Sequence, residues 1–176
     1  MKVREEIFEI DETLRRRQPH PQRGAPRRVA RVVKEIAAPK VQLPVAAILT
    51  ILLRRRRVRG ALTPVTAAAI AFLVERASKR LVRRRRPPSY HGPELYESFP
   101  SGHTASTAAL WLTLARLLER DGIVRPPFAT AAAVVLIAFV GETRLLLDEH
   151  WPSDVLAGAL LGTSAAGISE ATLASR

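Results

Sequence analysis

The chain alternates between apolar segments and strongly charged linkers. Five apolar segments cover residues 41–53, 61–74, 104–118, 128–140 and 155–168. Alanine and leucine dominate these segments, and none shows the period-two alternation of a half-buried strand. The pattern therefore predicts an all-α fold in which each segment forms a helix.

The apolar positions of these segments cover all sides of the expected helices rather than one stripe. A helix that is apolar all round is buried in a large core or in lipid, and a chain this small can bury only about one such helix in water. We therefore expect an integral membrane helical bundle with four to five transmembrane helices; a soluble bundle is the alternative. Gly158 and Gly162 form a pair of small residues that suits close helix packing.

Segment 41–53 is the weakest candidate for a full span. Pro44 interrupts it, and it is shorter than the roughly 20 apolar residues that cross a bilayer. If it is re-entrant or interfacial, the N-terminal residues and the arginine-rich linker after it share the cytoplasmic face, and four helices cross. Short basic linkers favour the cytoplasm, so the polar stretches at the other face are expected outside it.

Charge narrows the choice of partners. The formal net charge is +12, with 28 lysines and arginines against 16 acidic residues. Such a balance predicts an anionic partner, which can be nucleic acid, anionic lipid or a phosphorylated substrate. The absence of cysteine excludes disulfides and thiolate metal sites.

Residues 1–35 are predicted to form a basic arm, partly disordered or interfacial. Pro19, Pro21, Gly24 and Pro26 argue against one continuous helix. A short helix is expected near residues 27–38, where apolar residues recur at helical spacing and can lie on a membrane. We expect the arm to bind anionic lipids, and residues 1 to about 26 to be dispensable for catalysis. Residues 36–170 then form the membrane-embedded domain, and residues 171–176 a short tail.

The stretch "TRLLLDEHWPSD" carries charged residues beside an apolar run. His150 and Asp154 are four residues apart, so they share a helix face if Pro152 lies in the first turn, where proline is tolerated. A carboxylate beside an imidazole fixes its tautomer and raises its basicity. Taken alone, the pair also fits a capped helix start, and Arg144 fits a snorkelling side chain at a membrane edge.

Two further stretches carry groups that suit phosphate. In "FPSGHTAS", Ser101 is a good N-cap, Gly102 permits close approach to the backbone, and the N–H groups of the helix start form an anion site. In "KRLVRRRRPP", Lys79 supplies a point charge and Arg86 a planar fork for oxygens. Taken alone, these are an ordinary capped helix and a basic boundary or nucleic-acid patch.

In their order and spacing the three stretches resemble the signature of the type 2 phosphatidic acid phosphatase superfamily. The matched patterns are Lys-x6-Arg-Pro, Pro-Ser-Gly-His and Thr-Arg-x5-His-x3-Asp, over residues 79–154. That superfamily includes membrane lipid phosphatases, isoprenyl diphosphate phosphatases and soluble vanadium haloperoxidases. Thr143 stands where the family usually has serine, and it keeps the hydroxyl.

The resemblance implies a role for each matched residue. His150 attacks phosphorus and forms a phosphohistidine, Asp154 orients His150, and His103 protonates the leaving oxygen and later activates water. The phosphate is held by Lys79, Arg86, Ser101, Gly102 and Arg144. No metal and no cofactor are expected. His91, in the loop between the first two motifs, is expected to be an ordinary loop residue.

The implied substrate is a phosphomonoester or diphosphate on a lipid. Candidates are an isoprenyl diphosphate, a polyprenyl-phosphoryl sugar phosphate, phosphatidate and phosphatidylglycerophosphate. The implied location is the cell membrane, as a multi-pass protein with an extracytoplasmic active site and no nucleic-acid partner. Two alternatives stay open: a non-enzymatic basic module that binds membranes or nucleic acid, and a soluble haloperoxidase, although those chains are much longer.

Overall fold

The structure is a computed structural model that describes residues 2–17 and 24–173. Within these ranges it contains seven helices and no strand, which confirms the all-α prediction. The helices are α1 (Lys2–Arg17), α2 (Ala25–Ile36), α3 (Pro39–Arg55), α4 (Thr63–Val82), α5 (Gly102–Arg120), α6 (Phe128–Leu146) and α7 (Pro152–Leu173). The expected helix break at Pro19 and Pro21 and the last residues of the expected tail lie outside the described residues.

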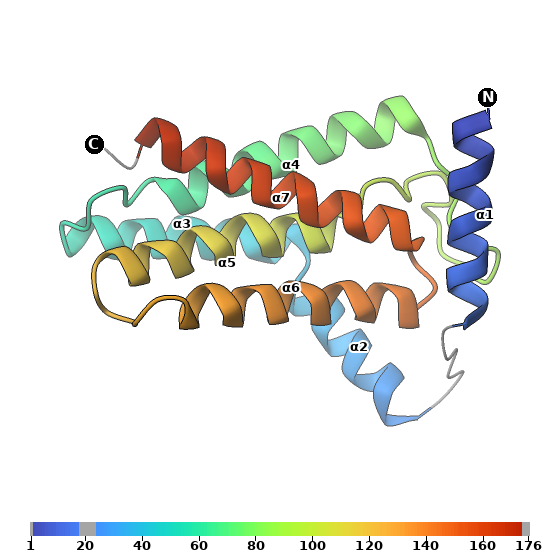
Figure 1. The fold of residues 1–176 in the computed structure, drawn as a ribbon, viewed down its shortest axis with the longest axis horizontal. Coiled ribbons are helices and arrows are strands. Elements are labelled where there is room, and N and C mark those ends of the chain that lie inside the picture. Colours follow the sequence, from blue (N-terminus) through green and yellow to red (C-terminus); the bar gives the residue numbers. More distant parts are fainter. Residues whose placement is uncertain (1, 18–23, 174–176) are drawn as a thin grey trace.

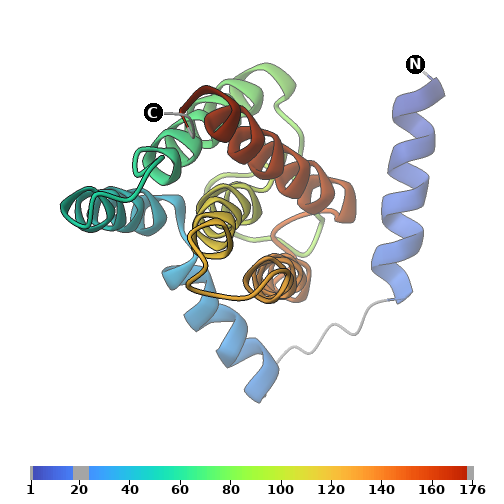
Figure 2. The same cartoon turned by 60° about the vertical axis from the view of Figure 1, so that its left-hand side comes forward.

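Helices α3 to α7 form a lengthwise bundle around α5 (Figure 1). Helix α5 contacts α3, α4, α6 and α7, and the turned view in Figure 2 shows it surrounded by them. Helices α4 and α6 finish at the same end of the bundle where α5 and α7 begin. We call this the site end, because all three motifs lie there.

Each predicted apolar segment lies in a helix, but the helices run past the apolar residues. Helix α4 continues to Val82 and carries Lys79 in its last turn, and α6 carries Arg144 in its last turn. Helix α7 begins at Pro152, as expected, so Asp154 lies in its first turn. The last turns of α4 and α6 can carry charge because Lys79 pairs with Glu75 and Arg144 pairs with Glu149 at the site end.

The bundle core is built mostly from alanine, in clusters such as Ala67, Ala71, Ala109 and Ala165. Gly158 and Gly162 of α7 lie so close to α5 that an added Cβ would collide with the carbonyl oxygens of Ser101 and Ala105. The predicted close packing at this pair is therefore confirmed.

Large apolar side chains lie on the outside of the bundle instead. Val135 of α6 is 68% exposed, and Leu73 of α4 is 66% exposed. Among the described helices, α6 alone is long and apolar enough to cross a membrane by composition; α2 and α3 pass the same test as a pair bent by 52°. Four to five spans therefore stay a prediction, because the other helices carry charged or small polar residues.

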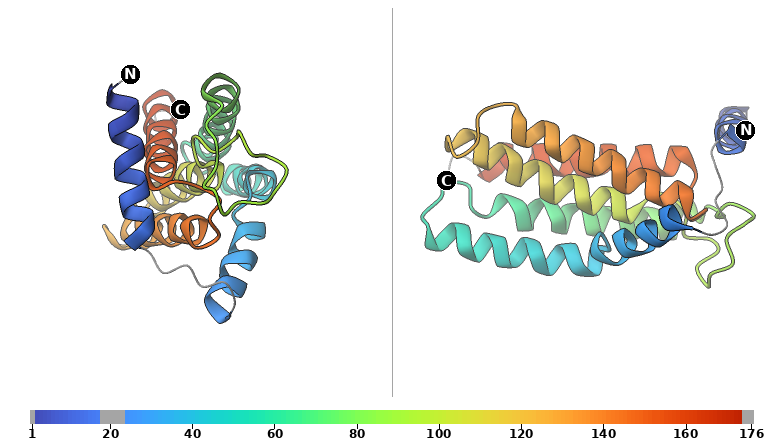
Figure 3. Two further views of the ribbon diagram at one scale, coloured as in Figure 1. Left: turned by 90° about the vertical axis from the view of Figure 1, so that its right-hand side faces the viewer. Right: turned by 90° about the horizontal axis from the view of Figure 1, so that it is seen from below.

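The N-terminal residues are more regular than expected. Helix α2 confirms the short helix predicted near residues 27–38, whereas α1 was not predicted. Figures 1 and 3 show α1 lying across the site end, while α3 runs along α4 and finishes at the opposite end of the bundle. Helix α1 and the linker after α3 thus lie at opposite ends of the bundle. A shared face was expected only if segment 41–53 does not cross the membrane, and the membrane topology stays a prediction.

Candidate active site

The site end brings the three motifs together around one cleft of about 500 Å³. Its walls come from α2, α3, α4, the loop before α5, the first turn of α5 and the residues before α7. Five of the sequence-predicted residues line it: Lys79, Arg86, Gly102, His103 and His150. The other three, Ser101, Arg144 and Asp154, lie behind its walls.

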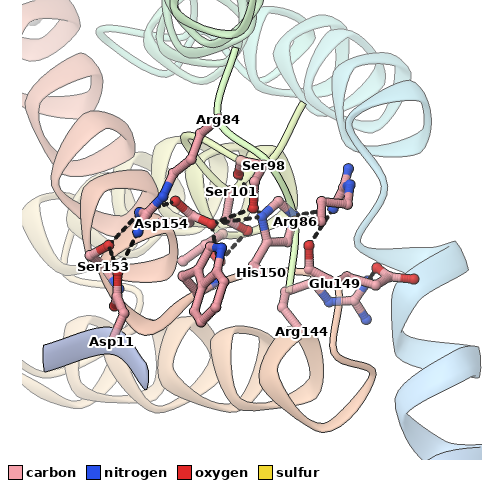
Figure 4. A network of polar contacts seen from close by, with 12 residues as sticks. Asp11, Arg84, Arg86, Ser98, Ser101, Arg144, Glu149, His150, Ser153 and Asp154 are labelled. Carbon is pink, nitrogen blue, oxygen red and sulfur yellow. Dashed lines mark hydrogen bonds and ion pairs between the residues drawn. The ribbon is translucent and has the colours of Figure 1, made fainter. Parts of the chain in front are cut away.

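His150 is buried and fixed from one side of its ring (Figure 4). Its Nδ1 lies 2.7 Å from the carbonyl oxygen of Ser98, and a carbonyl can only accept, so Nδ1 carries the proton. The lone pair is therefore on Nε2, which lies 3.3 Å from Nη1 of Arg86. Burial lowers the pKa of His150; the Arg86 cation adds to this, and the Asp154 carboxylate opposes it.

Asp154 contacts His150 less directly than the sequence suggested. Its Oδ2 lies 3.8 Å from Nδ1 of His150, too far for a hydrogen bond. Instead, Oδ2 accepts a hydrogen bond from the Ser98 hydroxyl at 2.5 Å, and Oδ1 accepts one from Arg84 at 2.7 Å. Ser98 thus joins Asp154 to His150 through its own hydroxyl and carbonyl. Sequence reasoning missed both Ser98 and Arg84.

The network continues to α1. Ser153 and Arg84 both bond Asp11, which is 1% exposed. We call Asp11, Arg84, Ser98, Ser153 and Asp154 the orienting network. Figure 4 shows these residues meeting on one side of the His150 ring.

Ser101 occupies the predicted N-cap position of α5 but does not face the cleft. Its hydroxyl bonds the Thr104 hydroxyl at 3.0 Å and makes no capping bond to the backbone. The close packing of Gly158 against Ser101 places that side chain in the interface between α5 and α7.

A carboxylate lies beside the predicted anion site at the start of α5. Glu75 is buried, and its carboxylate lies against Gly102. A Cβ added to Gly102 would lie 2.7 Å from Oε1 of Glu75. The same Oε1 lies 2.6 Å from Nζ of Lys79. Glu75 therefore neutralises the lysine that was predicted to bind phosphate.

A second carboxylate separates Arg144 from the cleft. Arg144 is fully buried, and its Nη1 lies 3.2 Å from Oε2 of Glu149. The other carboxylate oxygen of Glu149 lies 2.5 Å from Nζ of Lys34, on α2. Thr143 accepts hydrogen bonds from Arg144 through its hydroxyl. The sequence offered one signal for Glu149, its place beside His150, and none for Lys34.

Arg86 is held by neutral acceptors rather than by a close carboxylate. Its Nε donates to the carbonyl of Glu94 at 2.9 Å and its Nη1 to the carbonyl of Glu149 at 2.5 Å. The nearest carboxylate oxygen, on Glu94, is 3.7 Å from Nη2. We call the cavity, with Lys34, Lys79 and Arg86 in its walls and Arg144 behind Glu149, the cation cleft.

His103 faces the cation cleft from the first turn of α5. Its Nε2 is buried and has no hydrogen-bond partner among the described residues. A buried polar atom without a partner is uncommon, so this nitrogen is free to bond a ligand. Over the same described ranges, no group of three or more metal-binding side chains forms a metal site.

Most of the chain is similar to known proteins of one family. Residues 60–172 match the family model described as the PAP2 superfamily. Similar proteins include a lipid A 1-phosphatase of Rhizobium etli, 30% identical over 55% of this chain and 43% of the relative. A decaprenylphosphoryl-5-phosphoribose phosphatase of Mycobacterium tuberculosis is 39% identical over 65% of this chain and 61% of the relative. The match thus spans only about two fifths to three fifths of these relatives.

The fold has solved counterparts. A transmembrane PAP2 type phosphatidylglycerolphosphate phosphatase from Bacillus subtilis superposes with a TM-score of 0.73 and 22% identity, covering 97% of this chain and 86% of that one. LpxE of Aquifex aeolicus superposes with a TM-score of 0.67 and 21% identity, covering 92% and 93% of the two chains. At these identities the likeness concerns the fold.

Proposed function

The chain belongs to the PAP2 superfamily, and from that premise we propose that it is a lipid phosphatase that hydrolyses a phosphomonoester or diphosphate on a lipid. One observation carries the proposal. His150 directs an unprotonated Nε2 toward the cation cleft, because its Nδ1 proton is engaged by Ser98. A buried nucleophile beside several cations suits attack on an anionic phosphorus.

The proposed reaction uses both cleft histidines. Nε2 of His150 bonds phosphorus while the bond from phosphorus to the lipid oxygen breaks, and His103 gives that oxygen a proton. Water then attacks the phosphohistidine, His103 removes its proton, and phosphate leaves with His150 restored. The unpartnered Nε2 of His103 supports this role. Arg86 supports the developing charge, because it stands beside His150 without a close carboxylate.

Substrate phosphate is proposed to replace two internal carboxylates. Glu75 now holds Lys79 and lies at Gly102, and Glu149 holds Lys34 and Arg144. A phosphate that enters the cleft offers these cations a stronger anion. Arg144 and the Gly102 N–H reach it when the carboxylates withdraw. We assign the Ser101 hydroxyl to holding the start of α5, since it bonds Thr104.

The lipid assignment rests on the bundle's outer surface and on helix length. Helices α4 to α7 contain 19 to 22 residues, or about 29–33 Å at 1.5 Å per residue, close to the ~30 Å hydrocarbon core. Small residues inside and large apolar residues outside are typical of helices packed in lipid. We therefore propose that residues 36–170 form a multi-pass domain in the cell membrane.

The two N-terminal helices fit the membrane interface. Ile7, Ile10 and Leu14 form an exposed apolar stripe on α1, which lies across the bundle axis. Such a helix can lie in the interface, where basic residues attract anionic lipids.

We propose that the site end faces away from the cytoplasm, supported by the short arginine-rich linker after α3 at the other end. A His91→Cys variant should then react with a membrane-impermeant thiol reagent in intact cells, and Ile123→Cys, at the other end, should not.

A phosphate-release panel tests the activity. Purified protein in detergent with EDTA would be given lipid A, undecaprenyl diphosphate, a decaprenylphosphoryl sugar phosphate, phosphatidate and phosphatidylglycerophosphate. The first three follow the names of similar proteins. We expect release from at least one lipid, lost in His150→Ala. Membrane binding without release from any lipid would support the non-enzymatic alternative instead.

A further inference from the structure

The face of α1 that meets the bundle carries a buried carboxylate. Asp11 is 1% exposed. Its Oδ2 accepts hydrogen bonds from Arg84 at 2.5 Å and from the Ser153 hydroxyl at 2.6 Å, and its Oδ1 accepts one from the Ser153 N–H at 2.9 Å. Burying a carboxylate is costly unless it is paired and hydrogen-bonded. Asp11 meets this condition only while α1 is docked at the site end.

Asp11 is not the only residue of α1 that contacts the bundle. Phe8, one turn earlier, packs edge-on against Trp151, with ring centroids 5.3 Å apart. Trp151 directly follows His150 in the chain and is itself buried. This contact attaches the helix together with Arg15, which bonds Ser89 and Asp148, so Asp11 is not its only attachment.

Arg84 joins Asp11 to the site. Its Nη2 bonds Asp11, while its Nη1 bonds Asp154 at 2.7 Å and the Ser153 hydroxyl at 2.6 Å. The guanidinium is planar, so fixing one nitrogen restricts where the other can lie. Asp11 therefore helps to set the position of the cation that holds Asp154 (Figure 4).

The charges of this set also matter for His150. Two carboxylates, Asp11 and Asp154, share the single guanidinium of Arg84. Without Asp11, the charge of Arg84 would fall on Asp154 alone and would cancel the negative potential beside the imidazole. With Asp11, one negative charge remains to stabilise the positive charge that His150 gains when Nε2 bonds phosphorus.

We propose that Asp11 is a positioning residue of the active site, which acts through Arg84 to fix Asp154 and to keep its charge available to His150. This inference rests on the proposed phosphatase function. It makes α1 part of the catalytic unit, whereas the sequence predicted that residues 1 to about 26 are dispensable for catalysis. Asp11 does not touch the cation cleft, so substrate binding should not depend on it.

Asp11→Asn is the test, with Glu6→Gln as the matched control, because Glu6 is an exposed acid on the same helix. The readout is phosphate release by the full chain in detergent, with a lipid that the wild type hydrolyses. Asp11→Asn should lower kcat by about tenfold through misplacement of the site. KM and inhibition by vanadate should stay within about twofold of wild type, and Glu6→Gln should match wild type.

A double-variant cycle with Arg84→Gln tests whether Asp11 acts through Arg84. If it does, Asp11→Asn/Arg84→Gln is no slower than Arg84→Gln alone. Three results would each overturn the inference. The losses of the two single variants multiply in the double variant, kcat is unchanged in folded Asp11→Asn, or Asp11→Asn raises KM alone. If Asp11→Asn does not fold, Arg84→Lys decides, because it keeps the charge without the fork; a full kcat there rejects the inference. A wild type that releases no phosphate rejects the proposed function instead.

Discussion

The two sides of the His150 ring are built in different ways. On the Nδ1 side, the orienting network links buried and half-buried side chains from α1, the loop before α5 and the start of α7 by short contacts. None of these residues lines the cleft. On the Nε2 side, the cation cleft is a cavity of about 500 Å³. Its cations are balanced largely by Glu75 and Glu149, the two carboxylates that we propose substrate phosphate replaces.

This difference fits the two tasks that the proposed function assigns to the site. A nucleophile gains from groups that are fixed before the reaction, because no reorganisation is then needed. A phosphate site must accept and release an anion, and buried cations without any anion would be costly when it is empty. Arg86 combines both properties, since backbone carbonyls fix it while its charge stays available beside Nε2. The comparison predicts that damage on the Nδ1 side lowers kcat, and damage on the Nε2 side changes anion affinity.

The largest expected effect comes from removing the ring itself. His150→Ala should reduce turnover to background, a loss on the order of 10³-fold or more, because no attacking atom remains. Phosphate release is the measurement, and circular dichroism should show an unchanged helical fold. His91→Ala is the matched control, since His91 is an exposed histidine of the neighbouring loop, and it should keep full activity. More than about a tenth of wild-type turnover in His150→Ala would reject the nucleophile assignment.

Asp154→Asn should be the next most damaging change. It removes the charge that faces His150 and the acceptor shared by Ser98 and Arg84, but it leaves the nucleophile. We expect kcat to fall on the order of 10²-fold with little change in KM, as for an orienting carboxylate. Steady-state kinetics on the lipid from the panel would measure both constants. A rise in KM with an unchanged kcat would place Asp154 on the phosphate side and break the comparison.

The motif residues could be predicted because their local spacing alone decides where they lie. His150, Asp154 and Pro152 needed only the start of a helix, and Lys79 and Arg144 only the end of one. Glu75 and Glu149 could not be predicted as anions of the cleft, because their roles depend on how α4 and α6 meet α5 and α2. The role of Asp11 could not be predicted either, because it bonds residues more than 70 positions away and belongs to no motif.

The same limit applies to the membrane prediction. Apolar segments gave the five bundle helices, but the ends of α4 and α6 were placed too early, because Lys79 and Arg144 are polar and fell outside the apolar segments. Tertiary packing explains why the helices include these charged residues, because at the site end each charge lies beside a partner of opposite charge. The position of α1 at the site end also could not be deduced, since it depends on contacts of Asp11 and Phe8 with distant residues.

The pH profile tests the balance between the two sides at the ring. Burial and Arg86 lower the pKa of His150, and Asp154 opposes them. Only the neutral His150 ring attacks, so the acidic limb of kcat, a drop of about tenfold per pH unit, should begin only below the lowered pKa of His150. The basic limb belongs to His103, which must carry a proton to act as the acid. Asp154→Asn removes the opposing carboxylate and should move this acidic limb to lower pH. An acidic limb at or above the ordinary histidine pKa, or a limb that moves upward in the variant, would contradict the assignment.

The smallest expected effect concerns the exchangeable side. Glu149→Gln removes the charge that now occupies Lys34 and Arg144, while its amide oxygen can still accept a hydrogen bond. If the carboxylate competes with phosphate, inorganic phosphate should inhibit the variant about fivefold more strongly, or by ~1 kcal/mol. Phosphate should also raise its melting temperature more than that of wild type, because the ligand stabilises the state that binds it. Glu170→Gln is the control, since it breaks a carboxylate–arginine pair with Arg116 away from the cleft and should leave phosphate inhibition unchanged. Weaker inhibition in Glu149→Gln would mean that this carboxylate helps to build the phosphate site; the anions on the Nε2 side would then be as fixed as those on the Nδ1 side.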